Sequence, residues 1–406
     1  IKMSINHKFL NSNLNQNIDL VTSEYFDDFV SKKIINPQFL EFIELANSYT
    51  NKKLLNKILE IANAIKTNKS SKVVVFGNYW ILRSIKACIS FIDVNPYMKN
   101  KKELEIILID ETMKIQNIKD QLKNLFYSNE DVTYVVCNFN LHNSNFIRGI
   151  NSFISSLKNK KGYFYLSKRI ILVKELFSKE SQFNFRFESN LVLTISNTVA
   201  SNFAFFSEIS LLILSLLGIN IIKFLNGFKS AQNAAFNNEI NENIPLQLAW
   251  FMSNESKICY FNLNNPSLES IFQYFVSVLN SLSKNVFFDF GVFPNNFYST
   301  SQMLFQGKNN KSIIFVKLEK EYFDYQISSD VSIKDLLSDL RIKKISNYSN
   351  ESFDVLTEYT SSFSHNLISF LSINKKDETH LGNLIGQLMF CLIYWSIINQ
   401  TNVFLK

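Results

Sequence analysis

Residues 71–86 contain a strand, a turn and a helix in succession, an arrangement that can bind phosphate. The apolar run Val73–Val75 predicts a buried strand, and the residues after the turn have the spacing of an amphipathic helix. Phosphate-binding turns of this kind hold glycines, because backbone N–H groups must come close to the anion. Here the turn reads Gly77-Asn78-Tyr79-Trp80. The sequence therefore predicts the scaffold of a phosphate site whose mouth is filled by aromatic rings, with Trp80 as the plug.

Glycine is scarce throughout the chain, and the shortage affects this turn most. The sequence has nine glycines in 406 residues, whereas average proteins use glycine at about 7% of positions. A surplus of Asn, Lys, Ile and Phe accompanies the shortage and is typical of an AT-rich genome. Codon bias is therefore a second cause for part of the missing glycine.

A second polar turn follows the apolar stretch Val132–Cys137, which predicts another strand. The turn contains Asn138, Asn140, His142 and Ser144. Asn140 or Ser144 is a candidate ligand for an anion, and the alternative is that they only cap the turn. His142 is the most interesting of the four histidines, with a site role or a surface role still open.

We find no Walker loop, Gly-x-Ser-x-Gly motif or His-Glu-x-x-His motif in the sequence.

The composition is that of a folded chain with one or two large domains. Apolar residues make up 46% of the sequence and aromatic residues 14%, which is enough for a sizeable core. The net charge is +7, and the longest basic cluster, Lys99–Lys102, is typical of a solvated loop. We therefore expect no nucleic-acid partner.

The cysteines and the apolar stretches indicate the cellular compartment in which the protein is expected. Four cysteines lie far apart without a Cys-x-x-Cys motif, which predicts buried free thiols in a reducing cytoplasm and no metal site. The first residues do not have the pattern of a signal peptide. The stretches Ile209–Ile222 and Leu388–Ile398 are too short to cross about 30 Å of hydrocarbon, and they predict buried helices. We expect a cytoplasmic protein that does not insert into a membrane.

Strands and helices alternate from residue 70 onward, which predicts α/β structure with parallel sheets covered by helices on both faces. Residues 1–66 predict mostly helix. The expected strands are Val73–Val75, Leu104–Ile109, Val132–Cys137, Tyr163–Leu166, Leu191–Ile195, Ile258–Asn262, Asn285–Phe290 and Ser312–Leu318. The expected helices include one that ends near Phe91 and others at Ile115–Phe126, Phe146–Leu157, Leu246–Met252, Leu268–Leu279, Val331–Leu340, Asp354–Tyr359 and Leu381–Ile398.

Further motifs follow the two turns in a fixed order over residues 70–404. They are Ser201-Asn202-Phe203-Ala204, Gly218-Ile219-Asn220, Asn265-Pro266-Ser267-Leu268, Gly291-Val292-Phe293-Pro294 and Leu381-Gly382. Together with the turns, this ordered set resembles glucose-6-phosphate isomerase. That family has Gly-Gly-Arg-Phe-Ser, Gly-Ile-Asp, Tyr-x-Pro-Ser-Leu and Gly-Ile-Phe-Pro stretches in the same order.

The resemblance implies two doubly wound parallel-sheet domains of the sugar isomerase (SIS) type. The expected divisions are a helical N-terminal segment (1–66), a first SIS-like domain (67–185), a second SIS-like domain (186–380) and a C-terminal helix (381–406) that packs back on them. The family forms homodimers, so the resemblance also implies a second copy as a partner.

The residues that carry the family's chemistry are replaced in this sequence. Isomerisation of an aldose to a ketose needs a phosphate anchor, a ring-opening group and a carboxylate base. By resemblance, the family's base falls on Leu282, its histidine on Tyr298 and its arginine on Asn202. Leucine accepts no proton, and a tyrosine with its ordinary pKa of about 10 is a poor base at neutral pH. The vestigial phosphate-site positions are Gly77, Asn78, Tyr79, Trp80, Asn138, Asn140 and Ser144.

Two hypotheses follow from these replacements. The first is a catalytically inactive isomerase-like protein, a pseudoenzyme kept as a structural or assembly subunit of a protein complex, such as a cytoskeletal or motor-linked one. Its partners would be other protein subunits rather than a sugar phosphate, and it would need no cofactor and no metal. The alternative is a divergent active isomerase or a sugar-phosphate sensor, which would turn over or bind fructose 6-phosphate.

Overall fold

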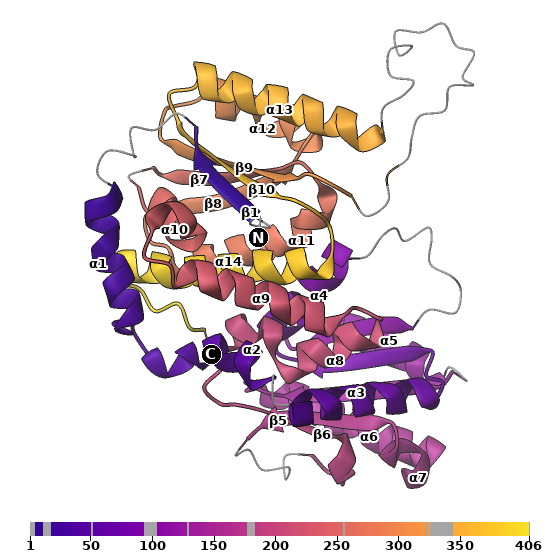
Figure 1. Cartoon of the computed structure of the whole chain (residues 1–406). Helices are drawn as coiled ribbons and strands as arrows, with labels where there is room; N and C mark the ends of the chain where they lie inside the picture. The colour runs from indigo at the N-terminus through magenta and orange to yellow at the C-terminus, as the bar shows by residue number, and fades with distance from the viewer. Residues whose placement is uncertain are drawn as a thin grey trace, which may run out of the picture. The chain divides into compact units, whose positions relative to one another are not determined.

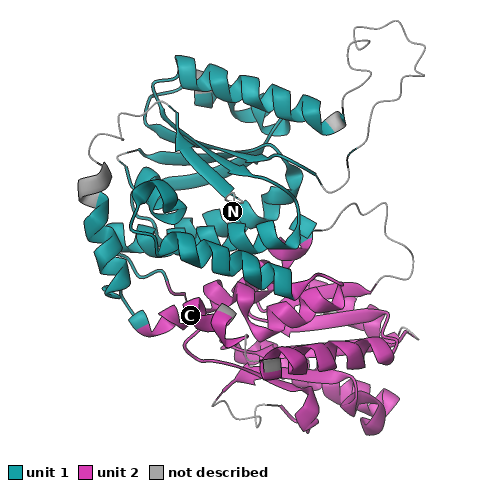
Figure 2. Cartoon of the chain, in the orientation of Figure 1, with its two compact units in different colours: residues 1–37, 90–94, 222–403 teal, residues 38–89, 95–221, 404–406 magenta. Residues whose placement is uncertain are grey.

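The computed structural model describes residues 5–10, 18–49, 52–92, 104–127, 130–176, 183–254, 256–321, 324 and 344–405. The chain forms two compact units, each built from segments that are distant in sequence (Figure 2). Unit 1 comprises residues 1–37, 90–94 and 222–403, and unit 2 comprises residues 38–89, 95–221 and 404–406. Each unit has its own five-stranded sheet flanked by helices, so the predicted α/β class with two parallel-sheet domains is confirmed (Figure 1).

The sheet of unit 2 is parallel throughout and has the strand order β3-β2-β4-β5-β6. Its strands are β2 (Lys72–Gly77), β3 (Glu105–Asp110), β4 (Val132–Asn138), β5 (Ile170–Glu175) and β6 (Val192–Ile195). The helices that begin in this unit are α2 (Leu45–Ser48), α3 (Lys52–Thr67), α4 (Tyr79–Ile92), α5 (Ile115–Tyr127), α6 (Ser144–Lys161), α7 (Tyr163–Ser167) and α8 (Glu208–Leu216). Short 3₁₀ helices lie at Pro37–Glu44 (η2), Ser189–Leu191 (η5) and Ser201–Phe206 (η6).

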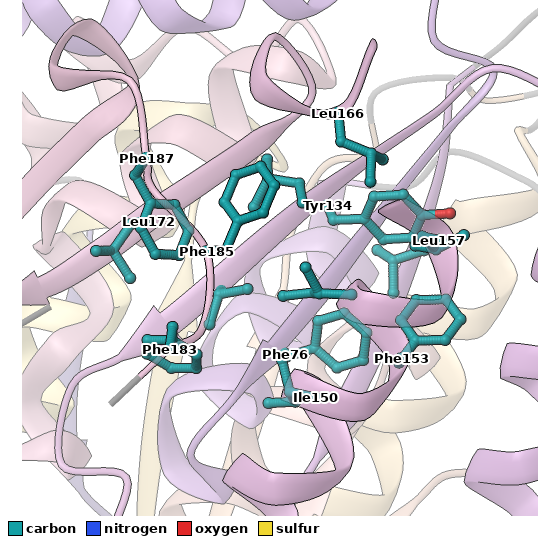
Figure 3. Packing of buried hydrophobic residues seen from close by; sticks show 14 of the residues in the cluster. Phe76, Tyr134, Ile150, Phe153, Leu157, Leu166, Leu172, Phe183, Phe185 and Phe187 are labelled. Atoms are coloured by element: carbon teal, nitrogen blue, oxygen red, sulfur yellow. The ribbon is translucent and has the colours of Figure 1, made fainter. Parts of the chain in front are cut away.

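Aromatic rings fill much of the core of unit 2. Phe76 of β2 and Tyr134 of β4 both pack against Phe153 of α6, with ring centroids 6.1 and 5.6 Å apart (Figure 3). Phe183, Phe185 and Phe187 cover the same cluster from the segment before β6. Burial of such large apolar side chains is the main stabilising contribution to a sheet of this kind.

The sheet of unit 1 has the strand order β1-β10-β9-β7-β8, and only the edge strand β1 runs antiparallel to its neighbour. Its strands are β1 (Ile5–Phe9), β7 (Ile258–Leu263), β8 (Phe287–Val292), β9 (Lys311–Leu318) and β10 (Leu367–Ile373). Its helices are α1 (Ile18–Val30), α9 (Ile221–Ala235), α10 (Ile244–Met252), α11 (Glu269–Leu282), α12 (Asn295–Gln306), α13 (Ile345–Phe363) and α14 (Glu378–Ile398). Single 3₁₀ turns lie at Ile240–Glu242 (η7) and Pro266–Leu268 (η8).

Helix α14 is the core helix of unit 1. Among the described residues it alone is long and apolar enough to cross a membrane, and 94% of its apolar window is buried inside the structure. Glycines let it lie directly against α9: a Cβ atom on Gly382 would stand 1.9 Å from the Phe224 carbonyl oxygen, and one on Gly227 would stand 2.0 Å from that of Thr379. Its composition is therefore explained by burial within the protein, as the sequence predicted for Leu388–Ile398.

The units differ from the expected domains at both ends of the chain. The N-terminal segment is not only helical, because Ile5–Phe9 forms β1 and pairs with β10 of unit 1. The boundary at residue 185 is wrong, since β6 completes the sheet of unit 2. The C-terminal helix is an internal part of unit 1 rather than a separate element. These boundaries depend on which strands pair with each other, and strand pairing cannot be predicted from local sequence patterns.

Two expected elements are also corrected. Tyr163–Leu166 is not a strand but lies in the short helix α7, which starts after Gly162 at φ +81°, and the strand β5 follows it. The apolar stretch Ile209–Ile222 is not one helix, because Gly218 adopts φ +79° and separates α8 from α9. The strands β5 and β10 were not predicted. The expected helix Val331–Leu340 lies outside the described residues.

Candidate functional site

The predicted phosphate scaffold lies where the strand order of unit 2 reverses direction. Strand β2 has β3 on one side and β4 on the other. Because crossovers between parallel strands are right-handed, the helices after β2 and β4 leave to opposite faces of the sheet. A crevice forms at the carboxyl ends of the strands at such a switch point, and it is where open α/β sheets bind ligands. The turns that follow β2, β3 and β4 meet there.

Asn78 connects these three turns through its buried side chain. Its Nδ2 atom donates a hydrogen bond to Glu111 Oε1 at 3.0 Å and another to the backbone oxygen of Asn140 at 3.0 Å. Its Oδ1 atom accepts a hydrogen bond from the backbone N–H of Trp80 at 2.9 Å and so caps the start of α4. The amide therefore closes the crevice between β2 and β4, instead of being turned outward to a ligand.

The carboxyl of Glu111 occupies the place of an anion in this crevice. Burial raises its pKa, while the nearby backbone N–H groups of Tyr79 and Asn143, and the imidazole of His142, act to lower it. Tyr79 and Asn143 stand at the starts of α4 and α6, where free N–H groups and the helix dipole favour a negative charge. A carboxyl of the chain itself therefore lies beside the groups that would hold a phosphate, and it accepts a hydrogen bond from one of them, the amide of Asn78.

The aromatic residues of the first turn contact each other at the start of α4. Tyr79 and Trp80 are both half-buried, and their rings meet edge to face with centroids 5.2 Å apart. The guanidinium of Arg83 lies 5.1 Å from the centroid of the Tyr79 ring. Trp80 as the plug stays a prediction, and the carboxyl of Glu111 is a further group at this turn, since it accepts a hydrogen bond from Asn78. Sequence reasoning missed Glu111, although its position directly after a predicted strand was a usable signal.

The residues of the second turn have mixed environments. Asn138 ends β4 and is buried, and Asn140 adopts φ +50° while its backbone N–H donates to Glu175 Oε1 at 3.2 Å. His142 and Ser144 are exposed. The helix α6 is capped by Asn143, whose side chain accepts from the backbone N–H groups of Asn145 and Phe146. The turn is thus organised by hydrogen bonds within the chain.

Asn202, which the sequence resemblance places at the family's arginine position, is hydrogen-bonded within the protein. It is fully buried in η6, and its Oδ1 atom accepts a hydrogen bond from the backbone N–H of Leu405 at 3.0 Å. The neighbouring Ser201 donates to the backbone oxygen of Leu405 at 3.0 Å. Both side chains therefore hold the C-terminal segment against unit 2.

Leu282 and Tyr298 lie in unit 1, in the two helices that precede and follow strand β8. Leu282 is the last residue of α11 and precedes β8, whereas Tyr298 lies in α12, which follows β8. Tyr298 is 86% exposed. The structure therefore does not bring these two positions together within their unit, and neither supplies an acid–base group buried in a site.

The described residues offer no conventional metal or thiol chemistry. They contain no group of three or more His, Cys, Asp or Glu side chains that could hold a metal ion. Cys88, Cys137, Cys259 and Cys391 are buried free thiols. Burial raises the pKa of Cys137 to about 12, and a thiol of this kind is a poor nucleophile at neutral pH.

Comparison with known proteins gives a clear result for the fold. No protein-family model and no curated protein sequence matches the chain. A solved glucose-6-phosphate isomerase from Chlamydia trachomatis D/UW-3/Cx matches 99% of this chain and 86% of its own chain, with a TM-score of 0.75 and 12% identity. The chain has the fold of a glucose-6-phosphate isomerase. A hypothetical protein, TT0462, from Thermus thermophilus is also similar, with a TM-score of 0.79 and 15% identity over 97% of this chain and 92% of that one.

The isomerase fold extends over nearly the whole chain, although the sequences share few residues. At 12% identity the similarity establishes the fold, and the functional residues have to be assessed one by one. The crevice of unit 2 lies at the position at which this fold class binds ligands, and the amide of Asn78 there is hydrogen-bonded to Glu111 and to the backbone of Asn140.

Proposed function

We propose that this protein is a catalytically inactive member of the glucose-6-phosphate isomerase fold that serves as a structural subunit of a protein complex. Its partners would be other protein subunits, and the family's homodimer is the first partnership to test. The proposal accounts for a fold that is retained while the chemistry-bearing positions have changed to Leu282, Tyr298 and Asn202.

The observation that carries the proposal is the carboxyl of Glu111 in the switch-point crevice. A phosphate group placed there would meet a negative charge instead of free N–H donors. The amide of Asn78 already donates a hydrogen bond to that carboxyl, and the backbone N–H groups of Tyr79 and Asn143 lie near enough to lower its pKa. Hydrogen bonds to a charged group are among the stronger polar contacts in proteins, so a phosphate would have to displace a bound competitor.

The same crevice gives the alternative function its one specific argument. Glu111 has a raised pKa and lies close enough to His142 to feel its charge. A carboxyl and an imidazole next to each other are the groups that general acid–base catalysis uses. A divergent isomerase or a sugar-phosphate sensor would therefore use Glu111 and His142.

Turnover and binding measurements separate these functions. Purified protein is assayed with glucose 6-phosphate and fructose 6-phosphate, and it is titrated calorimetrically with fructose 6-phosphate and 5-phosphoarabinonate up to millimolar concentration. We expect no turnover and no heat of binding. Turnover that disappears in both Glu111→Gln and His142→Ala would overturn the proposal and establish the alternative.

The structural role is tested by affinity isolation of the endogenous protein and identification of the chains that purify with it. We expect co-purifying protein subunits in fixed ratio to this chain. Recovery of the chain alone, at native concentration and low salt, would contradict the assembly role.

A further inference from the structure

The amino-terminal edge of the unit 2 sheet, opposite the crevice, carries a cluster of positively charged residues. Helix α6 starts after the carboxyl end of β4, so it ends at the opposite edge of the sheet, where α7 leads into β5 (Figure 1). The end of α6 and the residues after α7 carry five cations, which are Lys158, Lys160, Lys161, Lys168 and Arg169. Residues 144–169 contain no Asp or Glu. The positive charge is therefore not balanced within this segment.

The carboxylates that lie near this edge are engaged with other cations. Asp131 lies 3.4 Å from the guanidinium of Arg169. Glu130 and Glu105 lie 3.0 and 3.3 Å from the ammonium group of Lys72. In the described part of the chain, no carboxylate forms an ion pair with the four lysines, Lys158, Lys160, Lys161 and Lys168. These lysines therefore give the edge a surplus of positive charge.

Three exposed aromatic rings share this edge with the lysines. They belong to Phe164, Tyr127 and Tyr163, which are 73%, 67% and 39% exposed. Tyr127 ends α5, whereas Tyr163 and Phe164 begin α7. The hydroxyl of Tyr163 donates a hydrogen bond to the backbone oxygen of Arg186 at 3.1 Å. Arg186 and Glu188 on that segment are both exposed and add one charge of each sign, so the surplus is unchanged.

Each of the three rings has a lysine ammonium group over it. The distances from Nζ to the ring centroid are 4.2 Å for Lys168 and Phe164, 5.1 Å for Lys160 and Tyr127, and 5.7 Å for Lys158 and Tyr163. The apolar stems of the lysines therefore lie along the rings while their charges stay in water. The result is a surface of projecting rings and ammonium groups, defined here as the α6–α7 surface.

This combination fits the surface of an anionic lipid bilayer. Aromatic rings are favoured at the level of the lipid headgroups, and lysines are attracted to the negative charge there. A single strand of RNA would instead stack its bases on free ring faces. Here an ammonium group covers one face of each ring, and Phe185 packs against Tyr163 with the centroids 5.4 Å apart. A peptide needs a groove or a free sheet edge, whereas rings that are two-thirds exposed project from the surface.

We propose that the α6–α7 surface docks the protein onto membranes that contain anionic phospholipid. The contact is peripheral, because the rings enter the headgroup layer and the lysines bind lipid phosphates while no segment crosses the bilayer. The inference goes beyond the proposed structural role and does not depend on it. A bilayer would bind this surface whether the protein is a subunit of a complex or an enzyme.

Co-flotation of the full chain with lipid vesicles tests the contact. Vesicles of phosphatidylcholine with about one-third phosphatidylglycerol are compared with vesicles of phosphatidylcholine alone. We expect the protein to float with the anionic vesicles only. Binding should weaken between about 0.1 M and about 1 M salt, because salt screens exposed charges. Equal flotation with both kinds of vesicle, or no flotation with either, would overturn the proposal.

A charge variant tests the role of the lysines. Lys158→Gln combined with Lys168→Gln should raise the dissociation constant for anionic vesicles at least about tenfold, because each lysine near the surface contributes to the attraction. Lys86→Gln combined with Lys229→Gln removes the same charge from exposed positions of α4 and α9. This matched control should bind the vesicles like the wild type. Equal weakening in both proteins would mean that only net charge matters and would contradict a defined docking surface.

A ring variant tests the aromatic contribution. Phe164→Ser should raise the dissociation constant at least about fivefold, because the ring no longer enters the headgroup layer. Phe363→Ser, whose ring in α13 is 71% exposed, is the matched control and should bind like the wild type. Circular dichroism and thermal unfolding establish that all variants are folded. Unchanged binding of the folded Phe164→Ser protein would refute the insertion of this ring.

Two further measurements distinguish the membrane from other partners and from the proposed function. Fluorescence anisotropy with labelled oligouridylate and with labelled polyglutamate measures binding of RNA and of an acidic peptide. Tighter binding of either one than of the anionic vesicles would assign the surface to that partner and overturn the membrane contact. Isomerase turnover would refute the inactive structural role, and it would leave the flotation result unchanged.

Discussion

At the scale of single residues, one carboxyl lies at the switch point of the unit 2 sheet, where open α/β sheets bind ligands. Glu111 accepts a hydrogen bond from Asn78, and the backbone N–H groups of Tyr79 and Asn143 act to lower its pKa, at the carboxyl ends of β2 and β4. Sequence reasoning identified the turn and its missing glycines, and it proposed that Trp80 fills the space. It did not consider Glu111, because that residue follows a different strand, and only the order of strands in the sheet brings it to the turn.

Removing this carboxyl should restore an anion site. In Glu111→Ala the amide of Asn78 loses its carboxyl acceptor and the backbone N–H groups of Tyr79 and Asn143 lose a neighbouring negative charge, so we expect inorganic phosphate to bind with a dissociation constant in the millimolar range, about −4 kcal/mol. Calorimetric titration with phosphate measures it. Glu188→Ala, which removes an exposed carboxyl elsewhere in unit 2, should bind no phosphate. Equal behaviour of the two variants would show that Glu111 does not block these donors.

A second buried carboxyl should make stability depend on pH. Glu208 begins α8, and burial raises its pKa to about 7, against the effect of the neighbouring Tyr49 hydroxyl, which lowers it. The folded state then holds a proton that the unfolded state releases above about pH 4.5. The free energy of unfolding should therefore fall by about 3 kcal/mol as the pH rises from 4.5 to 7, and it should change little from this group above pH 7.

Urea unfolding of Glu208→Gln between pH 4.5 and 8 checks this expectation. The variant should lack this fall in stability and should be more stable than the wild type at pH 8. Glu60→Gln, at an exposed position of α3, is the control and should keep the wild-type slope. A slope that is identical in both variants would contradict the assignment to Glu208.

At the scale of elements, the few glycines show how helices are placed. Gly227, Gly382 and Gly386 let α9 and α14 pack with almost no space between them, and this contact forms the centre of unit 1. Gly149 has the opposite environment, since the space above it is open. The sequence indicates that both kinds of glycine lie in helices, but it does not distinguish a glycine that packs from one that leaves a groove.

The same substitution should therefore have opposite effects at two helix positions. Gly149→Ala should stabilise the protein by about 0.5–1 kcal/mol, because alanine favours helix and its methyl group meets no atom. Gly382→Ala should destabilise it by about 2 kcal/mol or more, because its Cβ would stand 1.9 Å from the Phe224 carbonyl oxygen. Thermal unfolding of the two variants measures both signs. Destabilisation by Gly149→Ala would show that the space above it is filled.

At the scale of the whole molecule, the chain forms each unit from segments that are distant in sequence. Strand β1 at the N-terminus pairs with β10 at residues 367–373, and the last residues join unit 2 through Asn202. Motif order along residues 70–404 was sufficient to indicate the isomerase fold, which a glucose-6-phosphate isomerase of known structure shares. It was not sufficient to place the boundary between the units.

The stability of two fragments should distinguish the observed limits of unit 2 from the expected limits of the first domain. Residues 38–221 contain all five strands of the unit 2 sheet together with α3 and α8, so we expect this fragment to unfold cooperatively. Residues 67–185 lack β6, α3 and α8, and we expect them to show no cooperative transition. Circular dichroism during heating makes the comparison. Cooperative unfolding of the shorter fragment would mean that β6 is dispensable and that the expected boundary was adequate.

The sequence by itself determined the alternation of strands and helices and the resemblance to an isomerase, and it predicted that Leu282, Tyr298 and Asn202 stand where the family has catalytic residues. These properties are carried by local periodicity and by side-chain type, which can be assessed position by position. Only the tertiary structure placed Glu111 against the turn after β2, paired β1 with β10 and left the space above Gly149 open. Each of these depends on which strands and helices become neighbours, and residues far apart in the chain meet through contacts that no local pattern encodes.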